Sequence, residues 1–250
     1  MPELSTRRSG VLSVASAFPD PPFEVVVDGA ATGLDAELME AVCRRLGFRR
    51  ELVKYTGEDF NGIFDGLRSG AYDAVISGTT ITPEREKVAL FSEPYLESGQ
   101  SLVVNVRRTP HVGSVDDLAG LVVGIQVGNT SDAVARELKA RGAIADIRYY
   151  PYAGIERALD DLCAGRIGAF MKLLPVTTWL IRDRPELAVV QTGLTRERLG
   201  IAVAPDNPPL RDAVNGALTE LRRAGILTEL VDRWLSPSGR GEKSASSEGA

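Results

Sequence analysis

The chain has 250 residues, of which 44% are hydrophobic and 25% are charged, with a net charge of −5 and a pI near 5.2. These values are typical of a globular protein with one large or two small domains, and they exclude a disordered chain. The acidic balance argues against a general binder of nucleic acid or anionic membranes, and no apolar run is long enough to span a membrane. An anionic ligand therefore needs a local basic site.

The two ends of the chain differ in composition from the rest. We expect residues 1–9 to form an N-terminal arm, and they contain no apolar stretch of the kind found in secretion signals. Residues 236–250 are mostly Ser, Gly, Glu and Lys, so we expect a disordered tail that buries too little apolar surface to offset its ordering entropy. Two locations stay open: periplasmic or extracellular if a signal sequence is missing from this chain, and cytoplasmic if Met1 is the true start.

The cysteines and the single histidine do not form a metal-binding pattern. Cys43 and Cys163 each fall in an amphipathic helical run, far apart and without C-x-x-C spacing, so we interpret both as buried apolar residues rather than a disulfide. His111 follows a proline near a turn and has no Cys or His at ligand spacing. The sequence predicts neither a metal site nor a cofactor.

The first part of the chain alternates strands and helices. A short buried strand at 11–15 precedes a proline-rich bend at 17–23. Apolar residues then repeat every four positions from Leu34 to Leu46, and the Gly47 that follows predicts the helix end. A second helix is predicted from Asp59, a favourable N-cap, to a stop at Gly70.

The most informative stretch follows the strand predicted at 72–76. Thr82 is a good N-cap and Pro83 suits the first helical position, so this turn directs free backbone N–H groups at whatever lies above the strand. Such a turn binds anions, and Arg85 adds a planar guanidinium that can hold a carboxylate through two parallel hydrogen bonds. Further donors are the hydroxyl groups of Ser77, Thr79, Thr80 and Thr82.

The second part of the chain repeats this strand–turn–helix pattern. We expect an extended run at 99–106 to cross into a second lobe, and a run at 199–203 to return to the first. A buried strand at 121–125 ends in a polar turn that starts a helix at Ser131, again with donors at the helix start. The remaining predicted elements are strands at 147–150, 167–171 and 189–190 and helices at 155–164, 176–182, 210–221 and 227–235.

The run Ala74–Arg85, with the sequence A-V-I-S-G-T-T-I-T-P-E-R, resembles the signature of the type II periplasmic solute-binding proteins of family 3. These are receptors for polar amino acids in ABC importers. Four further segments agree with the family in order and spacing, so the resemblance covers about residues 10–235. They are 33–35, 59–63, 123–130 and 164–167.

The resemblance implies an α/β fold of two αβ lobes joined by two crossing strands, a Venus-flytrap arrangement. Lobe 1 would comprise residues 10–100 and 199–235, and lobe 2 residues 101–198 with the hinge crossings at its ends. It also implies that a small polar carboxylate, an amino acid or related organic acid, binds between the lobes of a monomer. An ABC permease would then be the protein partner.

The resemblance also assigns the ligand contacts. Arg85 and the turn hydroxyls of lobe 1 would hold the ligand carboxylate, and the polar turn of lobe 2 would meet it on closing. Phe60 matches the position that packs on the ligand, although an apolar helix face predicts a core residue equally well. The residues expected to contact the ligand are Ser77, Thr79, Thr80, Arg85, Phe60, Gln126, Asn129, Thr130, Phe18, Asp20 and Leu173.

Three positions depart from the family pattern. The family usually has an Asp two residues before a Pro, where it pairs with the ligand's α-ammonium group, but counting back from Pro175 this position is Leu173. A leucine leaves a buried ammonium unpaired, which costs several kcal/mol. Ala17 replaces an Asp of the cleft loop, and Asp20 replaces an aromatic residue. Phe18 is the candidate for the missing ring, and Asp20 for the missing negative charge.

Lys172 precedes this leucine. Strand alternation would direct Leu173 inward and Lys172 to solvent, so we favour a surface lysine. If Lys172 instead faces the cleft, it adds a second cation, which favours a dicarboxylate or keto acid, or it acts as an acid–base group.

Two classes of function follow, and we favour the first. The first is a receptor that binds its ligand and delivers it to an importer; a detached sensory domain would share this binding chemistry. The second is a cytoplasmic enzyme on the same fold, similar to the cyclohexadienyl (prephenate) and chorismate dehydratases, which act on ring carboxylates. The enzyme class needs an acid–base residue in the cleft, for which the candidates are Lys172 and Asp20, then Tyr150 or Tyr152. None of these forms a catalytic motif.

Overall fold

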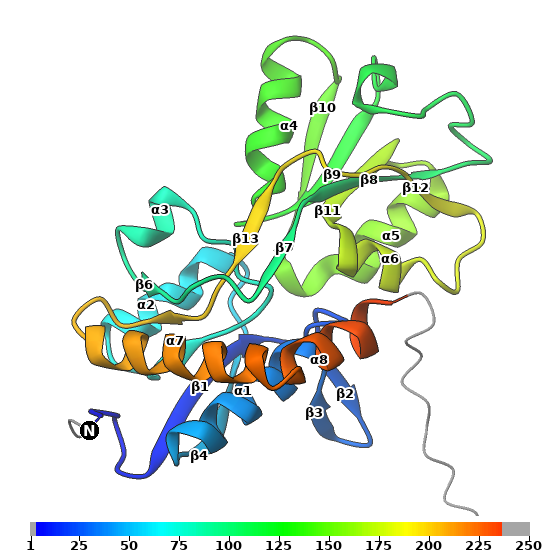
Figure 1. Ribbon diagram of the computed structural model, residues 1–250. Helices are drawn as coiled ribbons and strands as arrows, with labels where there is room; N and C mark the ends of the chain where they lie inside the picture. The colour runs from blue at the N-terminus through cyan, green and yellow to red at the C-terminus, as the bar shows by residue number, and fades with distance from the viewer. Residues whose placement is uncertain (1–3, 237–250) are drawn as a thin grey trace, which may run out of the picture.

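The computed structural model describes residues 4–236, which form two αβ lobes, each built on a five-stranded sheet (Figure 1). The predicted tail at 236–250 lies outside the described residues except for Ser236. Within the described part of the chain, no helix is both long and apolar enough to cross a membrane. The predicted fold class is confirmed.

Lobe 1 is organised around β1 (Val11–Ala17), whose seven residues are all buried. This strand lies between two parallel neighbours, and an antiparallel pair completes the sheet. Because helices cover the sheet, even the small residues of the strand are sealed from water. The sheet order is β4 (Arg49–Tyr55), β1, β5 (Ala74–Val75), β14 (Ala202–Val203) and β6 (Leu90–Phe91), with a separate hairpin of β2 (Val25–Val27) and β3 (Ala30–Thr32).

The helices of lobe 1 follow the predicted patterns. Most apolar positions of α1 (Leu34–Leu46) are buried, with Leu46 buried only in part, and Gly47 ends the helix in the left-handed conformation that glycine adopts without strain. Asp59 caps a 3₁₀ turn, η1 (Phe60–Phe64), which continues as α2 (Asp65–Arg68). The remaining helices are the short α3 (Pro83–Glu86) and the closing pair α7 (Pro208–Arg223) and α8 (Ile226–Leu235), which pack on α1.

Lobe 2 has a mixed sheet with helices on it. Three of its strands run parallel, and β8 pairs antiparallel with its two neighbours. The order is β10 (Asp146–Tyr150), β9 (Val122–Gln126), β11 (Ala169–Leu173), β8 (Gln100–Asn105) and β12 (Leu187–Gln191). The helices are α4 (Ser131–Ala140), α5 (Ile155–Ala164) and α6 (Leu174–Leu180), with 3₁₀ turns η2 (Val115–Asp117) and η3 (Tyr152–Gly154).

Two short antiparallel strands, β7 (Leu96–Ser98) and β13 (Glu197–Leu199), connect the lobes (Figure 1). Both crossings therefore lie earlier in the chain than the extended runs suggested. The run at 99–106 is mostly β8, a strand of the second sheet, and the run at 199–203 is mostly β14, a strand of the first. An apolar run indicates a buried strand, but it does not indicate which sheet the strand joins.

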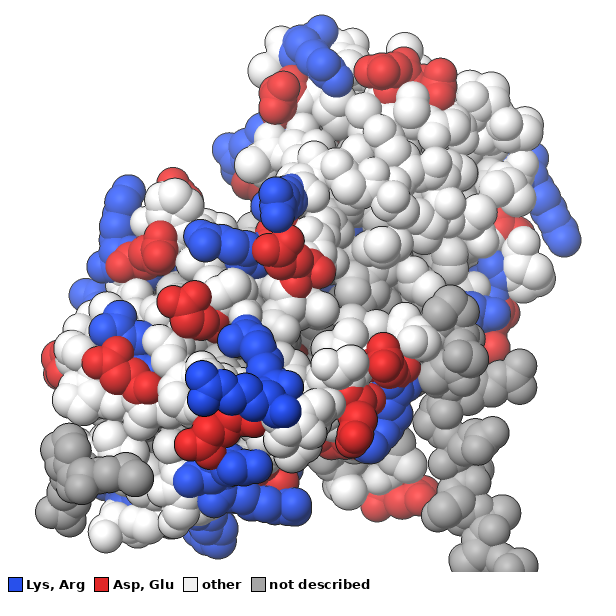
Figure 2. All heavy atoms as spheres, in the orientation of Figure 1, with Lys and Arg blue, Asp and Glu red and all other residues white. Residues whose placement is uncertain are grey.

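The surface carries no large field of one sign on the face in view. Figure 2 shows Lys and Arg side chains interleaved with Asp and Glu over lobe 1, whereas most of lobe 2 on this face is uncharged.

Cys43 is buried as predicted, but Cys163 is only half-buried, with its Sγ atom 3.3 Å from Glu186 Oε1. The interpretation of Cys163 as a fully buried residue was wrong, since its helix end meets a polar loop.

Each lobe holds one of the chain's two tryptophans, and the two rings meet between the lobes. The rings of Trp179 in α6 and Trp234 in α8 are 6.0 Å apart, and the Arg182 guanidinium covers the outer face of Trp179. Any rotation of one lobe against the other changes this contact.

We therefore expect lobe opening to shift the intrinsic tryptophan emission to longer wavelength as both rings meet water. Fluorescence of wild type and Trp179→Phe during ligand titration checks this, and an equal shift in the variant would contradict it.

Candidate ligand-binding site

The turn after β5 has the predicted capping geometry. Thr82 is extended at the N-cap, its side-chain oxygen accepts the Arg85 backbone N–H at 3.2 Å, and Pro83 occupies the first turn. Thr79 is fully buried and has a structural role, since its hydroxyl oxygen accepts the Ser77 N–H at 3.1 Å. Gly78 has a φ of +52° and donates its N–H to a buried carboxylate, Asp35, at 2.6 Å. The buried Asp35 side chain therefore holds the turn in place.

Arg85 is a buried cation at the interface of the lobes, with 6% of its surface exposed. Its guanidinium donates to the carbonyl oxygen of Thr80 at 2.9 Å, to that of Gly128 in lobe 2 at 3.0 Å and to Asn61 Oδ1 at 3.3 Å. All three acceptors are neutral, and no Asp or Glu among residues 4–236 forms an ion pair with it. Burial lowers the pKa of Arg85 to about 10, so it stays charged at neutral pH.

Aromatic rings surround this cation. The Arg85 guanidinium carbon lies 5.0 Å from the centre of the Phe60 ring and 5.4 Å from that of Phe64. Phe60 also stacks on Tyr152 of lobe 2, with ring centres 5.2 Å apart. Phe60 therefore belongs both to the core cluster of lobe 1 and to the wall between the lobes, so the two interpretations of this residue are compatible.

A small cavity lies beside Arg85, where the two lobes meet. Its volume is only about 10 Å³, because protein side chains fill the cleft. The lobes are thus closed on one another. Eight of the eleven residues expected to contact the ligand line this cavity; Thr79, Phe18 and Gln126 do not. The full lining is Asp20, Phe60, Ser77, Gly78, Thr80, Arg85, Asn129, Thr130, Tyr152 and Leu173.

Lys172 is buried in the cleft, contrary to the prediction of a surface lysine. It is 2% exposed, and its Nζ lies 2.6 Å from Gln126 Oε1 and 3.1 Å from Asp20 Oδ1 of lobe 1. The alternation rule fails here because β11 is an interior strand of a sheet with helices packed on it, so both of its faces are buried. Leu173, at the strand end, also lines the cavity.

Tyr152 provides the ring that the sequence argument assigned to Phe18. Its hydroxyl donates to Asp20 Oδ2 at 2.7 Å, and its ring lies 4.9 Å beneath the Lys172 Nζ. Burial and the Asp20 carboxylate raise the pKa of Tyr152 well above its ordinary value, so it stays a donor. Phe18 is buried without lining the cavity, and the Tyr150 hydroxyl donates to Asp161 Oδ2 at 2.7 Å, so neither residue belongs to the cavity wall.

Glu197 is the site residue that sequence reasoning missed. It is buried on β13, and its carboxylate accepts hydrogen bonds from both lobes and from the crossing itself. The cue in the sequence was a Glu beside an apolar strand, R-E-R-L-G, which a surface hinge explains equally well. Its donors are Thr80, Gln100, Thr130 and Thr195, with distances of 2.9 Å from Thr130 and 2.7 Å from Thr195.

Two further carboxyl groups lie beneath the signature turn. Glu24 and Asp35 are both fully buried, and each has one side-chain oxygen without a hydrogen-bond partner among residues 4–236. Burial, with Asp35 and Asp20 nearby, raises the pKa of Glu24 well above its ordinary value. Burial likewise raises the pKa of Asp35 to about 7, although the Gly78 N–H and the Tyr95 hydroxyl oppose this shift. These groups hold protons that solvent-exposed carboxylates would lose.

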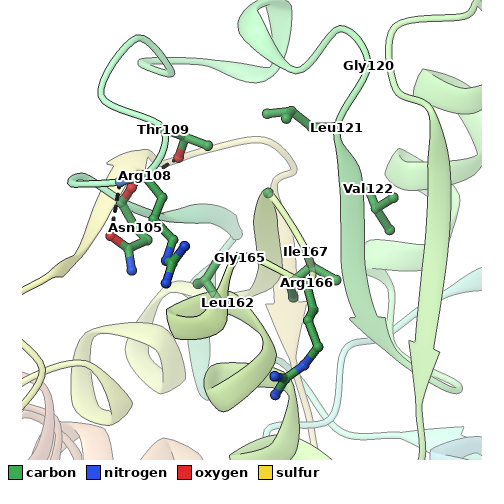
Figure 3. Close-up of a pocket in the computed structure, with 11 residues that line it drawn as sticks. Asn105, Arg108, Thr109, Gly120, Leu121, Val122, Leu162, Gly165, Arg166 and Ile167 are labelled. Carbon is green, nitrogen blue, oxygen red and sulfur yellow. Dashed lines mark hydrogen bonds between the residues drawn. The ribbon is translucent and has the colours of Figure 1, made fainter.

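A larger hollow of about 370 Å³ lies within lobe 2, away from the cleft (Figure 3). Its two arginines are already engaged. Arg108 Nε donates to the Cys163 carbonyl oxygen at 2.7 Å, and Arg166 Nε donates to Asp161 Oδ1 at 2.6 Å. Its walls come from one lobe, so no lobe movement can enclose a ligand there. Size alone does not identify the ligand site.

The family profile described as bacterial extracellular solute-binding proteins, family 3, matches residues 12–237, which is most of the chain. The chain belongs to this family. The resemblance read from the signature turn is thereby confirmed, as is the two-lobed fold expected from it. This protein is a solute-binding protein, and the interlobe cavity is the candidate for its ligand site.

The solute-binding protein is similar over nearly its whole length to proteins named for amino acids. It is 30% identical over 238 residues to the putative ABC transporter arginine-binding protein 2 of Escherichia coli K12, covering 92% of this chain and 93% of that relative. Identity to the L-cystine-binding protein of the same strain is 31%, with 91% and 84% covered. An ancestral arginine-binding protein bound to arginine has a TM-score of 0.82 at 31% identity, covering 90% of this chain and 98% of that one.

The residues that line the cavity of this solute-binding protein carry mostly polar, charged and aromatic side chains. Among residues 4–236, no group of three or more His, Cys, Asp or Glu side chains is arranged to hold a metal ion. His111 lies exposed on a turn.

Gly128 allows the lobes to approach closely. It has a φ of +80°, and a Cβ at this position would lie 2.2 Å from Asp59 Oδ1 and 2.7 Å from the Phe60 nitrogen of the opposite lobe. We expect Gly128→Ala to hold the cleft open and to weaken ligand binding about tenfold or more, since closing brings the side chains of the second lobe to the ligand. Gly142→Ala is the matched control, because its φ of +71° carries similar strain in open space. Small-angle scattering and titration calorimetry check this; a closed, tight-binding Gly128 variant would contradict it.

Asp35 makes the stability of the protein depend on pH. Its pKa rises from 3.8 to about 7 on folding, so between these values the folded chain keeps a proton that the unfolded chain releases. This contribution to the free energy of unfolding is therefore fully present at acid pH and falls as pH rises towards about 7, by a few kcal/mol in all. Asp35→Asn cannot ionise, so the stability gap between wild type and variant should shift with pH. Denaturant melts from pH 4.5 to 7.5, with exposed Asp206→Asn as control, test this; a constant gap would contradict it.

Proposed function

We propose that this solute-binding protein receives an amino acid or a closely related small organic acid for an ABC importer, and that Arg85 binds the ligand's carboxylate. The observation that carries this proposal is the buried guanidinium with only neutral acceptors, at the edge of an interlobe cavity. A buried cation without an ion-paired partner is costly: burial lowers the pKa of Arg85 by more than the charge of the nearby Glu197 raises it. A ligand carboxylate can replace two carbonyl contacts with two parallel charge-assisted bonds.

Lobe 2 offers donors from the other side. Asn129 and Thr130 line the cavity where α4 begins, so the Asn129 side-chain amide and the positive end of this helix dipole lie at the same cavity as Arg85. A ligand carboxylate that contacts both sets of donors stabilises the closed form over the open one. Closing is then a hinge rotation about β7 and β13, driven by the difference in ligand contacts between the two forms.

The relatives support the transport context of the proposal. Their names place arginine- and cystine-binding proteins in ABC transporters. We extend this to the present chain as a receptor outside the cytoplasmic membrane that docks, as a monomer, on an ABC permease. The closed form, with both lobes held together, is the form such a permease would have to distinguish from the open one.

Ligand stabilisation tests the role of Arg85. A ligand at a hundred times its dissociation constant adds about 2.7 kcal/mol to the free energy of unfolding, so a melting temperature near 5 °C higher or more is expected. We expect Arg85→Ala to abolish this shift and Arg85→Lys to reduce it, since a lysine ammonium is a point charge that lacks the planar fork. A thermal-shift screen against amino acids, dicarboxylates, 2-oxo acids, prephenate and chorismate measures it.

The matched control is Arg136→Ala, which removes an exposed arginine paired only with Asp132 on α4. It should respond to the ligand as wild type does. Ligand stabilisation that survives in Arg85→Ala would overturn the proposal. Conversion of prephenate or chorismate to product would place the protein among the enzymes of this fold instead.

A further inference from the structure

The charged groups at the cavity are not equivalent. Arg85 donates only to neutral acceptors, so its positive charge is available to a ligand. Asp20 is the one carboxylate among the cavity-lining residues, and both of its oxygens are occupied. Oδ1 lies 3.1 Å from Lys172 Nζ, and Oδ2 accepts the Tyr152 hydroxyl at 2.7 Å. The cavity therefore offers a free cation but no free anion.

The pair of Asp20 and Lys172 is not readily opened by a ligand. Both side chains are buried, with 5% and 2% of their surfaces exposed, and they come from different lobes. Lys172 also donates to Gln126 at 2.6 Å and lies over the Tyr152 ring, so it is held in place. A ligand ammonium that took Asp20 would leave Lys172 charged, buried and without a carboxylate, and such a group is strongly destabilising.

No other carboxylate compensates. Leu173 presents an apolar side chain to the cavity, and Glu197 lies behind Thr80 and Thr130, whose hydroxyls donate to it. Glu197 also accepts from Gln100 and Thr195, so its oxygens are used by neutral donors, and its charge acts on Arg85, whose pKa burial lowers and Glu197 raises. Glu24 and Asp35 lie beneath the turn and do not line the cavity.

We propose that Lys172 determines the ligand class by neutralising Asp20, so that the cleft prefers carboxylates without an α-ammonium group. A 2-oxo or 2-hydroxy acid should bind more tightly than the α-amino acid with the same side chain. This inference rests on the proposed function, because it assumes that Arg85 holds the carboxylate. It goes further by naming the atom that distinguishes good from poor ligands: a carbonyl or hydroxyl oxygen in place of the amine nitrogen.

Matched ligand pairs test this directly. Titration calorimetry of wild type would compare pyruvate with alanine, 2-oxoglutarate with glutamate, and phenylpyruvate with phenylalanine. In the pair that binds, the oxo acid should have a dissociation constant about tenfold lower or more, because only the amino acid brings an unpaired buried charge. Binding in every pair should depend on Arg85.

Two variants reverse the preference in different ways. Lys172→Met frees Asp20 to accept an ammonium, so the ratio of oxo-acid to amino-acid affinity should fall about tenfold or more. Leu173→Asp adds a carboxylate to the cavity wall and should shift the ratio in the same direction, whereas the neutral Leu173→Asn should not. Lys54→Met, which removes an exposed lysine of β4, is the control and should leave the ratio unchanged.

The outcomes separate the two proposals. Wild type that binds an α-amino acid more tightly than its oxo acid, in an Arg85-dependent manner, overturns this inference and leaves the proposed function standing. Carboxylate binding that is absent, or present without Arg85, overturns both. If Lys172→Met fails to fold in a thermal melt, the wild-type pairs and the Leu173→Asp and Leu173→Asn comparison still decide the question.

Discussion

The burial of one guanidinium group constrains the site more than any other interaction. Arg85 lies where two lobes, a turn and a helix start converge, and every group around it is placed to suit a cation. The N-cap of Thr82 sets its direction, the Gly78 N–H anchors the turn to Asp35, and Gly128 lets the other lobe come close. Water is excluded from this region, so each charge there has a larger effect than it would at the surface.

Local chemistry in the sequence predicted the elements well. Caps at Asp59 and Thr82 and the glycine stop at Gly47 were all recognisable, because each depends on residues within one turn of helix. The strand alternation rule misplaced Lys172, since it assumes one wet face and β11 has none. Pairing between distant elements carries no local signal.

The site shows the same difference between residues that act with their neighbours in sequence, which could be predicted, and residues whose partners are distant in the chain, which could not. Arg85 and the turn residues were identified because their chemistry is compressed into nine consecutive positions. The polar partners of Lys172, Gln126 and Asp20, lie 46 and more residues away in the chain, and Glu197 meets its donors only once the two crossings pair. For the same reason the sequence analysis chose Phe18 as the aromatic residue of the cavity, whereas the structure places Tyr152 there. Phe18 is closer to the cleft loop in sequence, but Tyr152 reaches the cavity in space.

Glu197 lies on β13, one of the two strands that connect the lobes, so a hinge motion would affect it differently from the residues that line the cavity. Points near a rotation axis travel least, so its bonds to Thr195 and Gln100 on the crossing side change little as the lobes part. The contacts between Asp20 and Lys172 and between Arg85 and Gly128 instead join the two lobes directly, so a hinge rotation would have to break both. A hinge rotation of this kind would leave Glu197 bonded to the crossing strand region while the direct contacts between the lobes are lost.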